Sequence, residues 1–455
     1  MADLKAIFKT YDVRGLVPAE LDDSITRLIG SAFAAEVAGH ARQVVVGHDM
    51  RDSSPGLARA FSDGVRDAGL DVVMIGLAST DQLYFASGHF RLPGAVITAS
   101  HNPAAYNGLK LCRSGAVAMS RDTGLSAIQD RVERHELASA RTAQPAEGRL
   151  TYVDVSPDYV AHLLRLAPVS GRRLKVAVDA GNGMAGHTVP PLFARLDVEL
   201  VPLYFELDGS FPHHEANPLD PANLHDLQTT VISSGADLGL AFDGDADRCF
   251  AVDENGDAVS PSALTALIAA RALAVEPGAH VIHNLITSRA VPETIERHGG
   301  VPVRTRVGHS LIKATMAEVN AIFGGEHSGH FYFRDFWYAD SGLLAALHLL
   351  AAAAESDLPV SELVAGFSPY APSGELNFEV ADPRAVIDEL AACYAGDDSV
   401  DLDRLDGLTV SSQRWWFNVR ASNTEPLLRL NVEATTFDLM VEIRERALTQ
   451  IRRVS

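Results

Sequence analysis

Three aspartates alternate along a short polar stretch of the sequence, Asp-Gly-Asp-Ala-Asp-Arg (243–248), which follows an apolar run. In extended backbone, alternate residues project to the same side, so Asp243, Asp245 and Asp247 are expected to converge. Carboxylates that converge repel one another unless a cation neutralises them, and oxygen-only ligands select a hard ion such as Mg²⁺ or Ca²⁺. A solvated acidic turn is the alternative interpretation.

The spacing must also be compared with that of a calcium-binding EF-hand loop. With Asp243 at position 1 of such a loop, positions 3 and 5 are aspartates and position 12 is Glu254. Position 6 of an EF-hand is a glycine, which makes a sharp turn, but here it is Arg248. The flanking segments also have the pattern of strands rather than helices. We therefore reject the EF-hand and predict magnesium.

Ser100 lies in a second polar stretch, Thr-Ala-Ser-His-Asn-Pro (98–103), which also follows an apolar run. Three carboxylates leave the octahedron of magnesium incomplete, and a phosphoserine at Ser100 would supply a further oxygen ligand. Lys110 and Arg248 are suited to phosphoryl charge, Arg248 through a bidentate fork and Lys110 as a point charge. An ordinary turn serine and paired surface cations are the alternatives.

Two further polar stretches are suited to a phosphorylated sugar. Glu326, Ser328 and His330 alternate within 325–330 and offer an acceptor, a hydroxyl and an imidazole, which could also carry a proton near neutral pH. Nearer the C-terminus, a predicted hairpin loop combines one guanidinium with hydroxyl, amide and backbone N–H groups that could clamp a phosphate. The clamp residues are Arg420, Ser422, Asn423 and Thr424. Purely structural roles in loops are the alternative.

A glycine pattern in the middle of the chain resembles a dinucleotide-binding fingerprint. Gly181, Gly183 and Gly186 follow a predicted strand and open a predicted helix, and Glu206 lies 20 residues further on. No dehydrogenase-like partner residues accompany the pattern. A tight structural turn between strand and helix is therefore expected here.

The elements that must position these residues repeat three times along the chain. In each repeat, strands alternate with helices, which indicates crossover units and mainly parallel sheets, with antiparallel additions such as 249–253. The expected strands are 43–47, 71–76 and 94–98, then 175–179, 199–205 and 237–242, then 280–285, 301–304 and 321–324. The expected helices are 56–69, segments near 189–196 and 224–233, 290–298 and 310–319.

The third strand of each repeat runs into one of the polar loops at 98–103, 243–248 and 325–330. In open α/β sheets, ligands bind at the carboxyl ends of strands, so the three loops are expected to face one cleft. Polar loops where the chain merely turns are the alternative.

The last part of the chain has a different pattern, with strands at 374–380, 414–420 and 427–433 and helices at 383–394 and 437–454. The two close strands predict an antiparallel hairpin. The whole sequence therefore predicts an α/β protein in which three related mixed α/β domains with crossover helices, plus a smaller C-terminal α+β domain, surround one central cleft. The expected domains are 1–150 (phosphoserine), 151–253 (metal), 254–368 (sugar) and 369–455 (phosphate clamp).

Composition excludes several classes of partner. The net charge of −21 argues against nucleic acid and anionic membranes, although a local cluster of Arg and Lys can still attract an anionic substrate. The three cysteines, Cys112, Cys249 and Cys393, are scattered and lack metal-ligand spacing, which favours a reducing cytoplasm. The N-terminus has no signal-peptide pattern, and the longest apolar run, 342–354, is too short to span a bilayer and predicts a buried helix.

Six motifs together resemble the phosphohexomutases, the family of phosphoglucomutase, phosphomannomutase and phosphoglucosamine mutase, over nearly the whole chain. They are the opening Tyr-Asp-Val-Arg-Gly (11–15), the serine loop 98–103, the metal loop 243–248, Gly-His-Ser (308–310), the sugar loop 325–330 and the phosphate loop 420–426. The resemblance implies a phosphoserine at Ser100, which also contacts the metal held by the three aspartates. It implies that Arg14, Lys110 and Arg248 are basic residues around the phosphoserine and that Tyr11 and His309 line the cleft. It also implies a sugar loop with Glu326, Ser328 and His330. The phosphate clamp would comprise Arg420, Ser422, Asn423 and Thr424.

Within this family, the opening and the Gly-Glu-His-Ser-Gly-His loop look like those of bacterial phosphomannomutases, including enzymes that also act on glucose phosphates. Phosphoglucosamine mutases usually differ in the opening and have Gly where Asn423 stands, and Ala421 replaces a frequent proline of the phosphate loop. The resemblance implies Mg²⁺, a hexose phosphate substrate, hexose 1,6-bisphosphate as activator and a place in carbohydrate metabolism and GDP-mannose biosynthesis. The oligomeric state can be that of a monomer or a dimer. The alternative functions are a phosphoglucosamine mutase, a magnesium-dependent sugar phosphatase and an oxidoreductase that uses the glycine pattern.

Overall fold

The computed structural model of the chain describes residues 4–134, 147–380, 382–421 and 427–454. It divides into two compact units. Unit 1 comprises Met1–Val259, Met316–Phe323 and Ser328–Leu363, and unit 2 comprises Ser260–Thr315, Gly324–His327 and Val364–Ser455. Among the residues described, no helix combines the length and the apolarity needed to cross a membrane.

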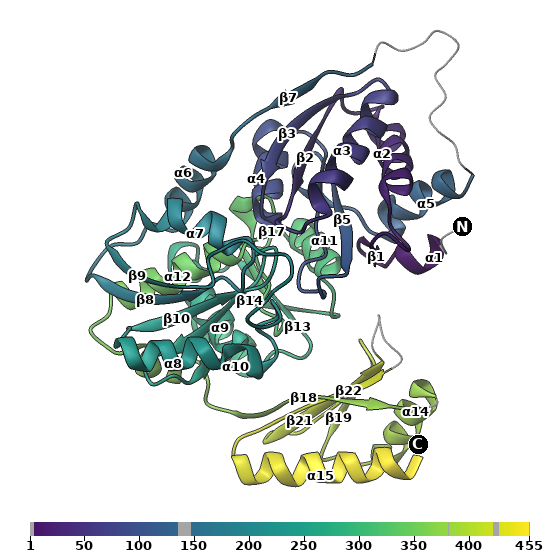
Figure 1. Cartoon of the computed structure of the whole chain (residues 1–455). Coiled ribbons are helices and arrows are strands. Elements are labelled where there is room, and N and C mark those ends of the chain that lie inside the picture. The colour runs from purple at the N-terminus through teal and green to yellow at the C-terminus, as the bar shows by residue number, and fades with distance from the viewer. Residues whose placement is uncertain (1–3, 135–146, 381, 422–426, 455) are drawn as a thin grey trace. The chain divides into compact units, whose positions relative to one another are not determined.

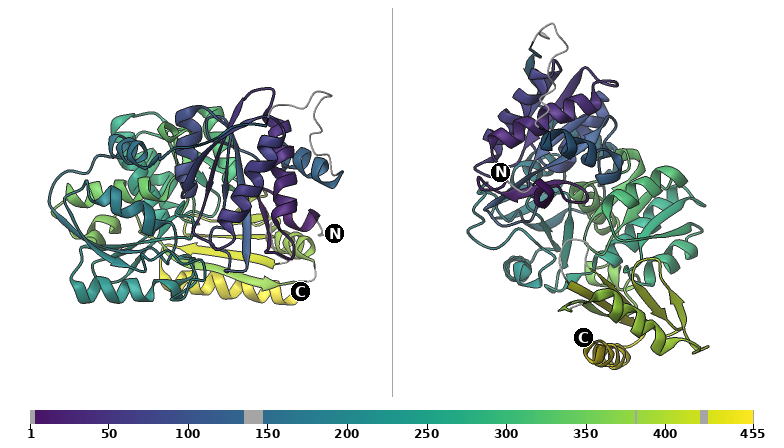
Figure 2. Two further views of the ribbon diagram at one scale, coloured as in Figure 1. Left: turned by 45° about the horizontal axis from the view of Figure 1, so that its top comes forward. Right: turned by 90° about the vertical axis from the view of Figure 1, so that its right-hand side faces the viewer.

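The first sheet of unit 1 has the strand order β1-β5-β4-β2-β3-β7, with β6 paired to β5 (Figure 1). Strands β4, β2, β3 and β7 run parallel to one another. Strand β5 pairs antiparallel with β4, and β1 pairs antiparallel with β5. The strands are β1 (Val13–Leu16), β2 (Gln43–His48), β3 (Asp71–Leu77), β4 (Gly94–Ile97), β5 (Tyr106–Arg113), β6 (Val117–Ala118) and β7 (Leu150–Tyr152). The helices are α1 (Leu4–Ile7), α2 (Asp23–Val37), α3 (Ser54–Asp67), α4 (Thr80–Phe90), the 3₁₀ turn η1 (Arg121–Thr123) and α5 (Leu125–Glu133). Helices α2 and α3 lie side by side against this sheet (Figure 2).

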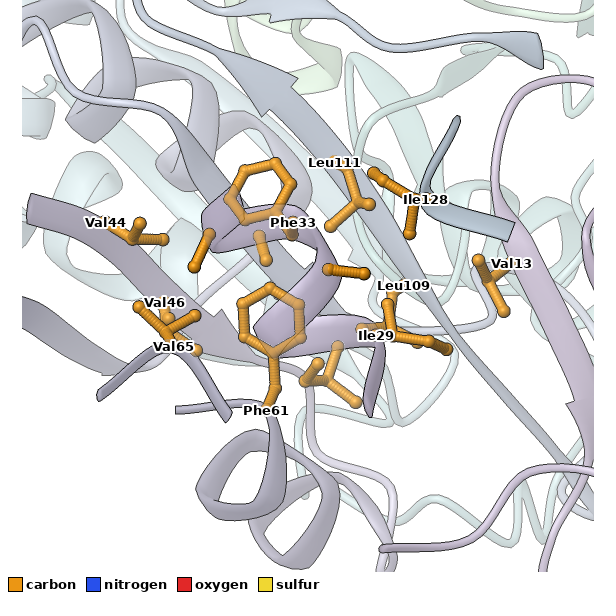
Figure 3. Packing of buried hydrophobic residues seen from close by; sticks show 14 of the residues in the cluster. Val13, Ile29, Phe33, Val44, Val46, Phe61, Val65, Leu109, Leu111 and Ile128 are labelled. Atoms are coloured by element: carbon orange, nitrogen blue, oxygen red, sulfur yellow. The ribbon is translucent and has the colours of Figure 1, made fainter. Parts of the chain in front are cut away.

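The core beneath α2 and α3 explains why these segments form helices and strands (Figure 3). The β-branched residues Val44 and Val46 alternate along β2 and bury their side chains against the two helices. Phe61 and Val65 repeat at helical spacing on the inner face of α3, and the ring of Phe61 lies 5.7 Å from that of Phe33 in α2. Each such buried side chain contributes roughly 1.5–3 kcal/mol.

The second sheet, also in unit 1, has the order β12-β11-β10-β8-β9. Strands β10, β8 and β9 are parallel, and β11 adds antiparallel to β10, so the expected antiparallel addition is confirmed. The elements are α6 (Ser156–Leu166), β8 (Leu174–Asp179), α7 (Ala185–Phe193), β9 (Val198–Leu203), η2 (Pro221–Leu224), α8 (His225–Ser234), β10 (Leu238–Phe242), β11 (Cys249–Asp253) and β12 (Ala258–Val259).

The third sheet has the order β14-β13-β15-β16-β17, in which β13 and β14 are parallel and β16 and β17 antiparallel. Its strands are β13 (His280–Asn284), β14 (Val301–Thr305), β15 (Phe323–Gly325), β16 (Phe331–Phe333) and β17 (Ala339–Asp340). The helices in this part of the chain are α9 (Pro261–Val275), α10 (Ala290–Arg297), α11 (His309–Val319), η3 (Arg334–Phe336), α12 (Gly342–Ala354) and α13 (Val360–Ala365). Helix α12 buries every residue except His348, which confirms the predicted buried helix.

The C-terminal part of unit 2 is an antiparallel sheet, β18-β22-β21-β20-β19, with α14 and α15 packed against it. The long helix α15 runs along the sheet (Figure 1). The elements are β18 (Ala371–Glu379), α14 (Pro383–Tyr394), β19 (Asp401–Asp403), β20 (Leu408–Ser411), β21 (Trp415–Ala421), β22 (Leu427–Ala434) and α15 (Phe437–Val454). The predicted α+β domain, its hairpin and the bounds of both helices are confirmed.

The predicted fold class of three mixed α/β domains and a smaller α+β domain is therefore confirmed. Among the helices that the sequence predicted, the one expected near 189–196 differs most from the structure, where it begins at Ala185. Pro190 and Pro191 lie inside this helix, and proline favours the first helical turn, so the sequence pattern suggested a later start. The bounds of the four domains remain a prediction.

Candidate active site

The acidic loop 243–248 joins the antiparallel strands β10 and β11 of unit 1. The loop does not stay extended, because Ala246 has a φ of 60° and its N–H donates to Asp243 O at 3.0 Å. The expected extended geometry was therefore wrong, and a tight turn brings the side chains together instead. Carboxylate oxygens of Asp243, Asp245 and Asp247 lie within 4.8 Å of one another, and all three side chains are buried. The predicted convergence of the three carboxylates is therefore confirmed, but a tight turn produces it rather than extended backbone.

Ser100 lies against this loop. It follows β4 and has a φ of 50°, in the left-handed region that a non-glycine residue seldom adopts. Its hydroxyl donates to Asp243 Oδ2 at 2.8 Å. A Cβ on Gly244 would lie 2.4 Å from Ser100 O, so only glycine allows the two loops to approach so closely. The structure thus brings together the serine and the acidic loop, which are 143 residues apart.

Two cations lie among the carboxylates. Lys110 of β5 places its Nζ 2.6 Å from Asp245 Oδ2 and also forms an ion pair with Asp247. Arg248 donates to Asp243 from its side-chain Nε at 2.8 Å and from its backbone N–H at 3.1 Å. Three carboxylates and two cations leave the cluster with a formal charge of −1, a composition suited to one further cation.

The carboxylates of the loop differ in their affinity for protons. Burial raises the pKa of Asp243 to about 7, and the neighbouring Asp245 and Asp247 add to this effect against the opposing charge of Arg248. Burial would also raise the pKa of Asp245, but Lys110 and the hydroxyl of Thr80 outweigh it and hold that pKa well below its ordinary value. Of Asp243 and Asp245, Asp245 is therefore the more firmly ionised.

The donor set of the acidic loop fits a hard divalent ion. Asp245 Oδ1 and Asp247 Oδ1 are buried and have no hydrogen-bond partner, so each has an oxygen to offer a cation. A second group of possible ligands, Asp247 with His330 and Asp340, also has its ligand atoms within 4.8 Å. Oxygen-only sets suit a hard ion such as Mg²⁺ better than sets with imidazole, so the three aspartates fit such an ion better than the second group does.

Thr80 contributes to the site although the sequence analysis did not identify it. The residue is fully buried at the first position of α4 and donates from its hydroxyl to Asp245 Oδ2 at 2.6 Å. Its backbone N–H also donates to Asp245 O at 3.1 Å. These two bonds fix both the main chain and the carboxylate of Asp245. The only sequence signal was the Ser-Thr pair that begins α4.

Arg51 was also missed, and it holds the backbone of the serine loop. It is 2% exposed, and its guanidinium donates to four carbonyl oxygens, those of Ser100 and Asn102 at 2.9 and 2.6 Å and those of Pro103 and Tyr106 at 2.9 Å each. A buried guanidinium that spans four carbonyls stabilises one conformation of this loop. Its position just after β2, at the carboxyl end of a strand, is the signal that could have revealed it.

Four more predicted residues belong to unit 1. Arg14 of β1 contacts Asn102 in the serine loop and forms a 2.7 Å ion pair with Asp12. His330 Nε2 lies 3.6 Å from Asp247 Oδ1, and its Nδ1 lies 2.9 Å from the Ser328 hydroxyl. The backbone of His330 also bridges to Arg248, which ties these two loops together. Tyr11 lies half-buried just before β1.

The remaining predicted residues belong to unit 2 or lie outside the description. Glu326 and Arg420 are both buried in unit 2, and Arg420 Nη2 donates to Glu375 Oε2 at 3.0 Å. Ser422, Asn423 and Thr424 lie outside the described residues. His309 begins α11, but its side chain also lies outside the description.

The glycine pattern at 181–186 serves packing. A Cβ on Gly183 would lie 2.8 Å from Gly244 O in the acidic loop, and a Cβ on Gly186 would lie 2.3 Å from Phe205 O. The structural turn expected here therefore has a clear reason, which is the close approach of neighbouring backbone.

Four family descriptions match successive parts of the chain. They are "Phosphoglucomutase/phosphomannomutase, alpha/beta/alpha domain I" over residues 5–139, domain II over 157–256, domain III over 260–370 and the C-terminal domain over 375–450. Together they span most of the sequence, in the order of the family.

Whole proteins match as well. The chain is 41% identical to the "Phosphohexose mutases" of Xanthomonas campestris over 449 residues, covering 98% of this chain and 99% of the relative. It is 38% identical to a phosphomannomutase of Vibrio cholerae, with 98% and 97% covered. A crystal structure of a phosphoglucomutase/phosphomannomutase family protein from Burkholderia thailandensis has a TM-score of 0.89, 34% identity and coverage of 99% and 98%. The chain therefore belongs to the phosphoglucomutase/phosphomannomutase family, whose members are isomerases that act on hexose phosphates.

Proposed function

We propose that this protein is a phosphomannomutase that interconverts mannose 1-phosphate and mannose 6-phosphate through a phosphoserine at Ser100. The observation that carries the proposal is the 2.8 Å hydrogen bond between the Ser100 hydroxyl and Asp243 within a buried group of three aspartates. A nucleophilic hydroxyl beside a site for a hard cation is the arrangement that phosphoryl transfer requires.

In the proposed reaction, the phosphoryl group on Ser100 Oγ is transferred to the free hydroxyl of the hexose monophosphate. The O–P bond to serine breaks as the O–P bond to the sugar forms, and the sugar hydroxyl gives up its proton. The product is a hexose 1,6-bisphosphate, which also serves as activator. After the bisphosphate has turned over, its other phosphoryl group returns to Ser100, so no phosphate is consumed and no nucleotide is needed.

The charged residues of the site have distinct roles in this scheme. Asp243, Asp245 and Asp247 would hold Mg²⁺, which would supply positive charge near the transferring phosphoryl group. Lys110, Arg248 and Arg14 add fixed positive charge near Ser100, and most catalysis of phosphoryl transfer comes from such charge. His330 is the candidate for accepting the sugar hydroxyl proton, because the burial of Lys110 is outweighed by its ion pairs with Asp245 and Asp247, which raise its pKa and keep it protonated.

The residues assigned to substrate contacts are Tyr11, His309, Glu326, Ser328 and His330 for the sugar and Arg420, Ser422, Asn423 and Thr424 for the non-reacting phosphate. Their assignment rests on the motifs and on the family. A cytoplasmic location and a role in GDP-mannose biosynthesis accompany the proposal.

Mannose phosphate is proposed as the substrate because relatives from Vibrio cholerae and Escherichia coli, each 38% identical, are named phosphomannomutases. The plural name "Phosphohexose mutases" of the Xanthomonas campestris relative supports glucose phosphates as a second substrate pair. A comparison of kcat/KM on mannose, glucose and glucosamine phosphates tests this order, and a preference for glucosamine phosphate would identify a phosphoglucosamine mutase instead.

The phosphoserine is tested by intact-mass measurement and by Ser100→Ala. We expect one phosphoryl group on the wild-type protein, none at this position in the variant, and loss of mutase activity by a factor of at least about 10³. Ser114→Ala, which changes an exposed serine after β5, is the matched control and should retain activity. Undiminished mutase activity of Ser100→Ala with the bisphosphate present would contradict the mechanism. Stoichiometric release of inorganic phosphate would identify a phosphatase.

A further inference from the structure

The guanidinium of Arg51 bonds to the serine loop through its N–H groups, and its face is covered by an aromatic ring that comes after β9. The ring centroid of Phe211 lies 5.1 Å from Arg51 Cζ, a distance at which a guanidinium and a ring attract one another. The backbone of the same segment is also close, because a Cβ on Gly209 would lie 2.7 Å from Arg51 Cα. The segment 208–211 therefore packs directly on the residue that holds the serine loop.

Phe211 has an unusual backbone conformation that local hydrogen bonds support. Its φ is 51°, in the left-handed region that a residue with a bulky side chain seldom adopts. The N–H of Phe211 donates to Asp208 O at 3.1 Å, and the N–H of Ser210 donates to Asp208 Oδ1 at 2.8 Å. Such conformations persist only where the surroundings fix them. The turn that begins at Asp208 therefore sets the direction in which the Phe211 ring points.

The glycine pattern at 181–186 anchors the start of this segment. Asn182, between two of the glycines, has a φ of 57°, and its Nδ2 donates to Glu206 O at 2.9 Å. Its backbone oxygen accepts from the N–H of Asp208 at 3.0 Å. The turn that resembled a dinucleotide fingerprint thus uses its side chain and its main chain to hold the segment that carries Phe211.

The far end of the segment is anchored by His214. Its Nε2 lies 2.9 Å from Asp179 Oδ2 at the end of β8, where Asp179 is 1% exposed. The other oxygen of this carboxylate, Asp179 Oδ1, accepts from the N–H of Gly181 at 2.8 Å. One buried carboxylate therefore connects the glycine pattern with the segment, and Phe211 lies between two anchors on the same sheet.

We propose that Phe211 is a positioning residue for phosphoryl transfer, which acts through Arg51 on the backbone of Ser100. This inference rests on the proposed function, in which Ser100 carries the phosphoryl group. The ring keeps water from the face of the guanidinium, and hydrogen bonds are stronger where water is excluded. With the ring in place, the bonds from Arg51 hold Ser100 in its left-handed conformation, in which its hydroxyl meets Asp243.

The first test compares Phe211→Leu, which stays apolar but lacks the ring, with Phe211→Tyr, which keeps it. We expect kcat of the leucine variant to fall about 10-fold and KM for the hexose monophosphate to stay within about threefold, because a misplaced nucleophile affects the transition state more than substrate binding. The tyrosine variant should retain most of the wild-type kcat. Leu207→Ala, which changes an exposed residue of the same segment, is the matched control. A kcat of Phe211→Leu within twofold of the wild type overturns the inference.

A double-mutant cycle tests whether Phe211 acts through Arg51. Arg51→Lys loses the planar fork that spans the carbonyls and should lower kcat by itself. If the ring matters only because it covers the guanidinium, adding Phe211→Leu to Arg51→Lys should change kcat less than about twofold. Effects of the two substitutions that simply multiply would overturn the inference, because Phe211 would then act independently of Arg51.

Hydrogen exchange measured by mass spectrometry gives a readout that does not depend on mutase activity. In Phe211→Leu, amides of 98–107 should exchange about 10-fold faster than in the wild type, while those of β10 exchange at the wild-type rate. Unchanged exchange at 98–107 overturns the inference, as does equal acceleration in both peptides, because the substitution would then loosen the whole unit. If the wild-type enzyme carries no phosphoryl group on Ser100 and isomerises no hexose phosphate, the proposed function fails, and the exchange of 98–107 still decides whether Phe211 holds the serine loop.

Discussion

In the acidic loop of unit 1, three carboxylates share two cations. In unit 2, by contrast, the guanidinium groups of Arg420 and Arg429 share the carboxylate of Glu375, and we name these three residues the arginine pair. Each cluster gathers like charges that would repel one another, and each leaves one unit of charge uncompensated. The acidic loop keeps a formal charge of −1 and the arginine pair a formal charge of +1. The first is therefore suited to binding a cation and the second to binding an anion.

The two clusters also differ in how they are held. The aspartates are 0–1% exposed and receive hydrogen bonds from Thr80, Arg248 and Ser100, so their geometry is fixed by the surrounding protein. In the arginine pair, the side chains of Glu375 and Arg429 are 20% and 22% exposed and hold one another. A rigid buried set of ligands suits a small ion with strict geometry, and a partly exposed pair suits a ligand that must enter and leave in two orientations.

Asp245→Asn should have the largest effect, because it removes a charged ligand from a set of three. We expect the affinity for Mn²⁺, measured by electron paramagnetic resonance, to fall at least about 100-fold, and kcat to fall with it. The affinity for inorganic phosphate at the arginine pair should stay within twofold. Asp257→Asn, which changes an exposed aspartate after β11, is the control. A parallel loss of phosphate affinity would show that the two clusters are not independent.

Arg420→Met makes the reciprocal change in unit 2. The guanidinium of Arg420 is buried, and its loss leaves Glu375 with less compensation, so KM for the hexose phosphate should rise about 100-fold. Mn²⁺ affinity should not change. Steady-state kinetics and the same Mn²⁺ titration check both statements, with Arg414→Met, an exposed arginine just before β21, as the control. An unchanged KM would remove Arg420 from the proposed clamp.

Thr80→Val tests how much the surroundings of the acidic loop contribute. Valine keeps the shape of threonine but cannot donate to Asp245 Oδ2, so the carboxylate loses its fixed orientation. Loss of a residue that orients a metal ligand typically costs 10- to 100-fold in metal affinity, and we expect about 10-fold here because the backbone bond to Asp245 O remains. Thr80→Ser keeps the hydroxyl and should bind Mn²⁺ like the wild type. Equal affinities for the valine and serine variants would contradict this role.

The sequence predicted the residues of the acidic loop better than it predicted what holds them. Alternating aspartates after an apolar strand, and a serine after another, were enough to predict that Ser100 and Asp243 belong to one site. The type of each residue carries that information, because only certain side chains bind metals or accept phosphoryl groups. The fold class followed from the alternation of strands and helices for the same local reason.

Residues that act through long-range contacts could not be predicted in this way. Thr80 is 165 residues from Asp245, and Arg51 holds four carbonyls that a local pattern does not connect to it. The turn at Ala246 was not predicted either, because the alternation of the aspartates would make their side chains converge in extended backbone as well. Glu375 and Arg429 are ordinary charged residues of strands, and only the pairing of β18, β21 and β22 brings them to Arg420.

Asp81 is another such residue, and it supports the helix on which Thr80 lies. It is fully buried in the first turn of α4 and accepts hydrogen bonds from Ser79 Oγ at 2.5 Å, Tyr159 OH at 2.6 Å and Ser341 Oγ at 2.7 Å. Burial raises the pKa of Asp81 from 3.8 to about 6, because the three hydroxyl bonds only partly offset the loss of water around the charged carboxylate. Asp81 therefore binds its proton more tightly in the folded protein than in the unfolded chain.

The sign of the resulting pH dependence follows from this difference. An acid whose pKa is raised by folding contributes stability that is fully present below pH 4 and is lost as the pH rises through about 6. The shift corresponds to about 3 kcal/mol in the free energy of unfolding. Asp81→Asn carries no charge at any pH, so the wild type should lose stability relative to this variant between pH 4.5 and pH 8, as measured by denaturant titration at both values. Asp438→Asn, in the exposed first turn of α15, should show no such difference. A relative stability of Asp81→Asn that is the same at both pH values would mean that Asp81 is ionised throughout, and that its three hydroxyl partners outweigh its burial.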